Sequence, residues 1–279
     1  MFRKGGLAPE EAAKLIAEGK MKHEGLYDWK EDFSSMEEYR SYMNRLGIEL
    51  YRIKAGESLT KEKFLIQAVL ALEELQEVFN LEVERLREWF GYHYPEYKEK
   101  KHERFVKAVQ KAREEFDNFS GSVGVPMDEK DREAFLLFSG HVLGNLEAQK
   151  GLEKYVDRLM EEVAPNTKDV LGPLLGAKII SMFGSLERMA KAPSSAIQLI
   201  GAEKSLFRHL KSGKKAKPPK YGLIYRHPRI QSLPQRLRGR AARIIASKAS
   251  MAARIDFFSG KRNPEIREKL EAELRRLVK

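Results

Sequence analysis

Apolar residues recur at a near-heptad spacing between Leu59 and Phe90. Leu65, Leu72, Phe79 and Leu86 lie seven residues apart, and Ala68, Leu75, Glu82 and Trp89 form a second series three positions later. Such a seam is typical of a helix that packs along its whole length against another helix. We expect one helix of about 32 residues, about 48 Å long at 1.5 Å per residue. Gly91 and Pro95 would end it.

A second apolar pattern follows between residues 97 and 119. His102, Phe105, Val109, Ala112, Phe116 and Phe119 are separated by three or four residues, and the Gly-rich stretch 120–126 ends the pattern. Two long helices joined by a Gly/Pro turn predict an antiparallel coiled-coil hairpin. Its seams would contact each other or a second copy of the chain. The residues expected at a dimer contact are Leu65, Leu72, Phe79, Leu86, Phe105, Val109 and Phe116.

The remaining chain also has helical spacing. Asp128 can cap a helix, and Asn166 or Thr167 can cap another after the turn at Pro165. Residues 1–57 are less regular, with short helices expected from Pro9 and between Ser34 and Gly47. No longer alternating run indicates a strand beyond this region. The chain is therefore expected to be mainly α, with a partial α/β or α segment (1–57), coiled-coil helices (58–124) and an all-helical domain (125–279).

Positive charge is concentrated at the C-terminal end. The chain has a formal net charge of +11, but residues 201–279 hold 22 Lys or Arg and 6 Asp or Glu, leaving 30 and 35 for residues 1–200. From Lys204 to Ile255 there are 15 basic residues and no acid. An uneven distribution of this kind indicates a surface for a polyanion, with a merely solvated basic face as the alternative.

The composition excludes several kinds of chemistry. Without cysteine the chain has no disulfides, thiol nucleophile or cysteine metal site. No HExxH, GxGxxG, GxxxxGK[ST] or GxSxG motif is present, and Ser212-Gly213-Lys214 lacks the rest of a phosphate loop. We therefore predict no catalytic residues, metal or cofactor. Since no apolar run is long enough to span a membrane and the N-terminus does not resemble a signal peptide, we expect a soluble, cytoplasmic protein.

The basic region has the residue types that bind RNA. Gly201 and Ala202 precede a helix on which Lys204 and Arg208 share a face. Arg208 and His209 can bind phosphates or stack on bases, as unpaired RNA requires. Leu206, Phe207 and Leu210 are expected in the core. The sequence leaves open whether Tyr221 and Tyr225, interleaved with Lys220 and His227, contact core or RNA. It also leaves open whether Arg240 and Arg243 bind RNA or form ion pairs.

These residues resemble the Nop domain, and the chain resembles archaeal Nop proteins of box C/D ribonucleoproteins. The resemblance lies in Gly201–Leu210, Pro219-Lys220-Tyr221-Gly222, Arg238-Gly239-Arg240 and Ala252-Ala253-Arg254-Ile255-Asp256. Ala164-Pro165-Asn166, Leu174–Lys178 and Gly184-Ser185-Leu186 extend it, and Arg85–Glu96 resembles the family's first coiled-coil helix. The match covers about residues 33–262.

This resemblance implies a non-catalytic scaffold for guide-directed RNA 2′-O-methylation. In the family, the Nop domain binds a kink-turn guide RNA already held by a small ribosomal-like protein, the coiled coil pairs two copies, and an N-terminal domain holds the methyltransferase fibrillarin. It assigns the RNA and partner surface to Gly201, Ala202, Glu203, Lys204, Arg208 and His209. Their positive charge makes Lys220, Arg238, Arg240 and Arg243 further candidates for the RNA-binding surface. Glu203 fits a helix cap or ion pair better than an RNA contact.

Some features depart from the family pattern. Ser205 stands where the family has Ala, and residues 1–57 are shorter than the fibrillarin-holding domain, so we expect only part of that domain. The chain ends at Lys279 without a lysine-rich tail, which favours the archaeal type. The alternatives are a splicing-type ribonucleoprotein component, a structural coiled-coil dimer with a generic basic head, and an RNA-modifying enzyme.

Overall fold

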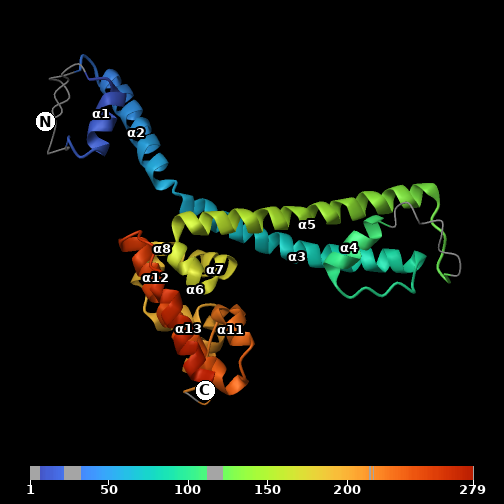
Figure 1. The fold of residues 1–279 in the computed structure, drawn as a ribbon. Helices are drawn as coiled ribbons and strands as arrows, with labels where there is room; N and C mark the ends of the chain where they lie inside the picture. Colours follow the sequence, from blue (N-terminus) through green and yellow to red (C-terminus); the bar gives the residue numbers. More distant parts are fainter. Residues whose placement is uncertain (1–6, 22–32, 112–121, 214, 216, 279) are drawn as a thin grey trace. The chain divides into compact units, whose positions relative to one another are not determined.

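In the computed structural model the regular secondary structure of the described residues is all helical, with no strand among them (Figure 1). The model describes residues 7–21, 33–111, 122–213, 215 and 217–278. It divides into two compact units, Met1–Thr60 and Lys61–Lys279. The predicted fold class is confirmed. Of the two possibilities for the N-terminal segment, α/β or α, its described residues show only helices.

The N-terminal unit is a pair of helices, α1 (Pro9–Ala17) and α2 (Met36–Ser58). Ser35 caps α2 by accepting a hydrogen bond from the Glu38 amide at 3.1 Å. Ala12, Ala13 and Leu46 form the small core between the two helices. The predicted stop at Gly47 is wrong, because α2 continues to Ser58. The residues after Gly47 keep a helical apolar pattern, so a glycine's intrinsic cost does not end the helix.

The second unit contains a helical hairpin made by α3 (Lys61–His93) and α5 (Glu129–Val163). Contacts from Lys61 to Glu162, from Leu75 to Gln149 and from Glu82 to His141 run in opposite directions along the two helices. The hairpin is therefore antiparallel, as predicted, and the two helices lie side by side in Figure 1.

The partner of α3, however, is α5 and not the predicted helix at 97–119. The described part of that segment forms the short helix α4 (His102–Lys111), which packs against both long helices, and Phe116 lies outside the described residues. The physical reason is length. With 33 residues, α3 can bury its whole seam against the 35 residues of α5, and the described part of α4 covers only one end of it.

The residues expected at a dimer contact are instead buried within this chain. Those on α3 and α4 that the structure describes are Leu65, Leu72, Phe79, Leu86, Phe105 and Val109. Leu65 belongs to a core shared with the C-terminal helices, and Phe79, Leu86, Phe105 and Val109 belong to a second core between α3, α4 and α5. A second copy cannot reach them in this packing, so their assignment to a dimer contact is wrong.

The C-terminal part of the chain is built on one long helix, α12 (Gln235–Phe258). The other helices of this part, in chain order, are α6 (Pro165–Leu171), α7 (Pro173–Phe183), α8 (Leu186–Lys191), α9 (Ser194–Leu199), α10 (Glu203–Lys211), the 3-10 helix η4 (Leu223–Arg226), α11 (Pro228–Gln231) and α13 (Glu265–Val278). Of these, α6, α8, α9, α11, α13 and η4 pack against α12. The small residues Ala242, Ala246, Ala249 and Ala253 of α12 are fully buried or nearly so. They allow α6, α8, α9 and α13 to pack closely against this helix.

The end of α12 is tied to the start of α6 by a buried carboxylate. Asp256 accepts hydrogen bonds from the backbone amides of Asn166 and Thr167 at 3.0 and 2.8 Å, and from both of their side chains at 2.7 Å. The prediction that Asn166 or Thr167 caps α6 is wrong, because both lie inside its first turn. The cap is supplied instead by a carboxylate about ninety positions further along the chain.

Candidate nucleic-acid interface

α10 carries the predicted binding residues and has no buried residue along its whole length. The chain enters it through Gly201, whose φ of +83° is a conformation that favours glycine. A Cβ at this position would lie 2.6 Å from a side-chain atom of Leu223. Glu203 accepts a hydrogen bond from the Gly201 amide at 2.7 Å. Gly201, Ala202 and Glu203 therefore shape the start of the helix, and Glu203 holds the residue before the N-cap Ala202 without capping the helix itself.

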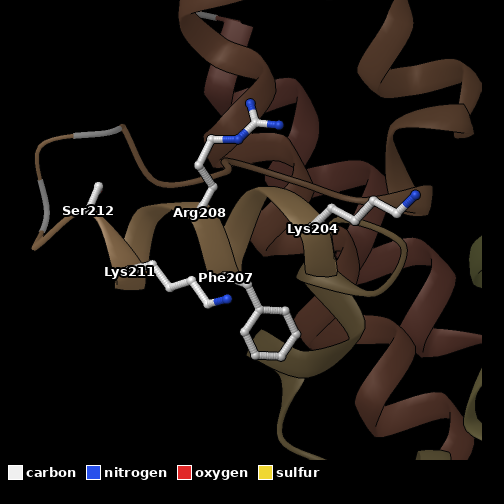
Figure 2. Close-up of a pocket in the computed structure, with 5 residues that line it drawn as sticks. All are labelled: Lys204, Phe207, Arg208, Lys211 and Ser212. Carbon is white, nitrogen blue, oxygen red and sulfur yellow. The ribbon is translucent and has the colours of Figure 1, made fainter.

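The cations of α10 lie around a hollow of about 860 Å³. Lys204, Phe207, Arg208, Lys211 and Ser212 line it (Figure 2). Figure 2 shows Arg208 on one side of the helix and Phe207 and Lys211 on the other. His209 is half-buried, and its carbonyl accepts a hydrogen bond from the Ser212 hydroxyl at 2.9 Å. The predicted residues Lys204 and Arg208 are thus exposed, on one short helix, with Lys211 beside them.

Two apolar residues of α10 are exposed rather than in the core. Phe207 and Leu210 are each 59% exposed, and Leu206 is half-buried. Placing Phe207 and Leu210 in the core is wrong, because α10 stands at the surface and only the side that carries Leu206 and His209 is partly covered. Apolar periodicity showed that the helix is amphipathic but not what covers its apolar face. Large exposed apolar side chains among cations are typical of a surface that binds another macromolecule.

The segment between α10 and η4 ends at Lys220, which is fixed next to α9 and α12. The side-chain amide of Gln198 donates to the Lys220 carbonyl at 2.7 Å. The backbone amides of Gly222 and Leu223 donate to the carbonyls of Gln198 and Ile200, respectively. A Cβ on Gly222 would lie 1.9 Å from the Ile200 carbonyl oxygen, so only glycine fits there. The aliphatic part of the Lys220 side chain lies over Gly239. Its Cδ would be 3.6 Å from a Cβ added to Gly239. Lys220 therefore lies between α9, which leads into α10, and the start of α12.

The predicted arginines of α12 fall into two groups. Arg238 is half-buried and donates to the carbonyls of Leu233 and Gln231 and to the Tyr225 hydroxyl. It stabilises the fold, so its charge is already engaged. Arg240 and Arg243 are exposed, and within the described ranges no acid lies at ion-pairing distance from either. Among the described residues the ion-pair interpretation therefore finds no support, and RNA binding by the two arginines stays a prediction.

The aromatic residues of this region support the fold. Tyr221 and Tyr225 stack at 4.8 Å and an angle of 11°, half-buried against the main core. His227 is buried. Its Nδ1 accepts a hydrogen bond from the backbone amide of Arg229, and its Nε2 lies 3.1 Å from the carbonyl oxygen of Val170. Burial lowers the pKa of His227, so the neutral ring donates from Nε2. Of the residues whose role was left open, the two tyrosines are therefore core residues.

Neither a metal centre nor a membrane span is found in the part of the chain that the structure describes. There, no three His, Asp or Glu side chains lie close enough to hold a metal ion together. In the same residues, no helix is both long and apolar enough to cross a bilayer.

Comparisons with known proteins agree with the resemblance. An uncharacterised NOP5 family protein of Methanocaldococcus jannaschii is 34% identical over 261 residues, which cover 85% of this chain and 63% of that protein. Nucleolar protein 56 of Saccharomyces cerevisiae is 33% identical over 242 residues, covering 77% of this chain and 48% of that protein. The chain thus spans less than two thirds of the length of these relatives.

A solved structure shares the fold. One chain of a crystal structure of a fibrillarin/Nop5p complex superposes with a TM-score of 0.53 and 22% identity, covering 95% of this chain and 91% of that one. The family model described as "Nop: snoRNA binding domain, fibrillarin" matches residues 71–279, three quarters of the chain. It includes α10, α12 and most of the hairpin. The chain therefore belongs to the Nop family.

Proposed function

We propose that the chain is a non-catalytic scaffold of a box C/D guide ribonucleoprotein, in which α10 binds a kink-turn RNA already held by a small ribosomal-like protein. The observation that carries this proposal is the state of α10. It is a helix with no buried residue that presents Lys204, Arg208 and Lys211 together with two exposed apolar side chains.

The cations account for the RNA half of the surface. Lys204, Arg208 and Lys211 are exposed and line one hollow, and none of the three forms an ion pair with a described residue. Arginine and lysine at such positions bind phosphate oxygens through charge-assisted hydrogen bonds. Their binding energy depends on salt because each phosphate contact releases counterions.

The apolar residues account for the protein half. Phosphates, riboses and the stacked bases of a paired RNA stem offer no partner for the Phe207 ring or the Leu210 side chain, each 59% exposed. A protein surface beside the RNA would cover them, and aromatic residues are enriched at the centres of such interfaces. Binding should therefore require RNA and protein together.

A gel shift on a kink-turn RNA, with and without the small kink-turn-binding protein, tests this composite surface. We expect tight binding only to the protein-bound RNA. Lys204→Ala with Arg208→Ala should weaken binding and reduce the salt slope by about one unit for each phosphate that is no longer bound. Arg276→Ala, an exposed arginine on α13, is the matched control. Equally tight binding to naked RNA would contradict the proposal, as would an unchanged slope in the double variant.

The methylation chemistry is assigned to a partner. Among the relatives are nucleolar proteins 56 and 58, and the similar solved chain comes from a complex with fibrillarin. We infer that this chain holds fibrillarin through its N-terminal unit and has no methyltransferase activity alone. Methyl transfer from S-adenosylmethionine to a guided RNA should need both proteins. Activity from this chain alone would indicate an enzyme instead.

A homodimer remains part of the proposal, through other residues of the hairpin. Leu70, Val78 and Leu81 of α3 are exposed, and Leu70 and Leu81 lie eleven residues apart, nearly in line on the helix. Leu81 is 69% exposed. We propose that a second copy covers this side of α3. Sedimentation of Leu81→Asp should show a monomer where the unsubstituted chain is a dimer, and a monomer in both cases would exclude the homodimer.

A further inference from the structure

The exposed side of α12 forms one continuous stripe along the helix. Its members follow at intervals of four or three residues, and all are exposed: Arg236, Arg240, Arg243, Ser247, Met251, Arg254 and Phe258. At 100° per residue they lie on one face, and from Arg236 to Phe258 the stripe is about 33 Å long. The acid Asp256, the one acidic residue of α12, is buried on the opposite side, in its bonds to Asn166 and Thr167.

The stripe is basic at its Arg236 end and carries an exposed phenylalanine pair at its other end, with Arg254 just before that pair. Arg236, Arg240 and Arg243 have no acid within ion-pairing distance among the described residues. At the other end, Phe258 is 67% exposed, and its ring meets that of the half-exposed Phe257 edge to face at 4.9 Å. Met251 lies between the two ends and is also exposed. Neither ring contributes to the core clusters.

We propose that this stripe binds a single-stranded RNA segment that leaves the kink-turn, with phosphates on the arginines and unpaired bases on Phe257 and Phe258. The inference rests on the proposed function for the kink-turn itself. Single-stranded RNA offers both chemistries that the stripe presents, a regular negative charge and exposed aromatic faces. A duplex keeps its bases stacked inside and would leave the phenylalanines uncovered.

The arginine end of the stripe lies close to the segment that leads into α10. Lys220, whose carbonyl is held by Gln198, lays its stem over Gly239 between Arg236 and Arg240. Gly201 at the start of α10 meets Leu223, three residues beyond Lys220. An RNA strand leaving α10 would therefore meet Lys220 and then the arginine end of α12, before it reaches the phenylalanine pair.

RNA probes with different tails test the stripe on the full chain together with the small kink-turn-binding protein. The probes are a kink-turn RNA without a tail, the same RNA with a ten-nucleotide oligouridine tail, and that tail made double-stranded. The single-stranded tail should raise affinity about fivefold or more, the gain from at least one base stacked on an aromatic ring. The double-stranded tail should add less.

Substitution of the ring pair should remove that gain. Phe257→Ala with Phe258→Ala should bind the tailed and tail-less RNAs alike, and its affinity for the tail-less RNA should equal that of the unsubstituted chain. Phe258→Tyr should keep the gain because it keeps the ring. Leu137→Ala is the matched control, since Leu137 is at least as exposed as Phe258 but lies on the hairpin. Both phenylalanines are exposed, and an unchanged melting temperature would confirm that the variant is folded.

The arginines give an independent readout. Arg236→Gln, Arg240→Gln and Arg243→Gln together should lower the salt slope for the tailed RNA by roughly 0.7 for each phosphate that is no longer bound. Arg275→Gln with Arg276→Gln, both exposed on α13, should leave it unchanged.

Three results would overturn the inference: no gain from the tail, a gain that survives the loss of both rings, or an equal gain from the double-stranded tail. A change in sedimentation of the ring variant without RNA would show that the stripe binds protein instead. If free oligouridine binds through the two rings while the kink-turn probe does not bind, the stripe is confirmed and the proposed kink-turn function fails.

Discussion

Replacing Asp256 by alanine should destabilise the C-terminal helices substantially. The carboxylate is 8% exposed and accepts four hydrogen bonds, two from backbone amides in the first turn of α6 and two from the side chains of Asn166 and Thr167. Alanine leaves these donors buried without an acceptor. Each buried donor that stays unsatisfied costs about 1–3 kcal/mol, and loss of a helix cap alone costs about 0.5–2 kcal/mol.

We therefore expect Asp256→Ala to lower the free energy of unfolding by about 3 kcal/mol or more, counting only the two amides and the cap. For a unit of this size the melting temperature would fall by about 6 °C or more. Asp256→Asn should act in the same direction, because its amide nitrogen would face a donor where the aspartate offered an acceptor. Thermal and urea unfolding measure both effects.

The control is Asp131→Ala, an exposed aspartate in the first turn of α5. If Asp256→Ala costs no more than this control, the four hydrogen bonds do not hold α12 to α6. The α12 stripe would then owe its position to apolar packing and not to the buried carboxylate.

Three further predictions concern other parts of the chain. Gly222→Ala should lower the melting temperature and weaken RNA binding together, because its Cβ would stand 1.9 Å from the Ile200 carbonyl at the entry to α10; unchanged values would refute the close approach. Leu72→Asp should unfold the hairpin by burying a charge, whereas Leu81→Asp should leave circular dichroism unchanged. Since burial lowers the pKa of His227 in the folded chain, the unfolded chain takes up a proton on this ring at a higher pH than the folded chain does. Stability should therefore fall as the pH drops below about 6.5, and more steeply than in His227→Gln.

The heptad pattern predicted the hairpin, and the family motifs predicted the Nop domain that the comparisons show. Local periodicity could not identify the partner of α3, because α4 and α5 both have apolar faces and only the folded chain shows which one matches its length. Local sequence could not predict the cap of α6 either. Asn166 and Thr167 looked like capping residues, but the acceptor is Asp256, far away in sequence.

The sequence identified the helix that carries the candidate residues but not which of its side chains are exposed, and that these residues bind RNA stays a prediction. Gly201, Glu203, Lys204 and Arg208 lie together at one exposed helix, as the motif implied. Phe207 was assigned to the core because a large apolar side chain usually is buried. That rule fails on a helix left uncovered, and the sequence contains no direct sign of which helix is left uncovered.

Charge counting also overstates the binding surface, because several of its cations hold the fold together. Arg238 donates to two carbonyls and a tyrosine, Arg254 to the Ala190 carbonyl, and Lys248 pairs with Glu273. Arg240 and Arg243 have no such partners among the described residues. Salt screens exposed charges over about 8 Å at physiological ionic strength, but it weakens half-buried hydrogen-bonded pairs much less. Raising the salt concentration should therefore release a bound RNA well before it unfolds the helices that position these two arginines.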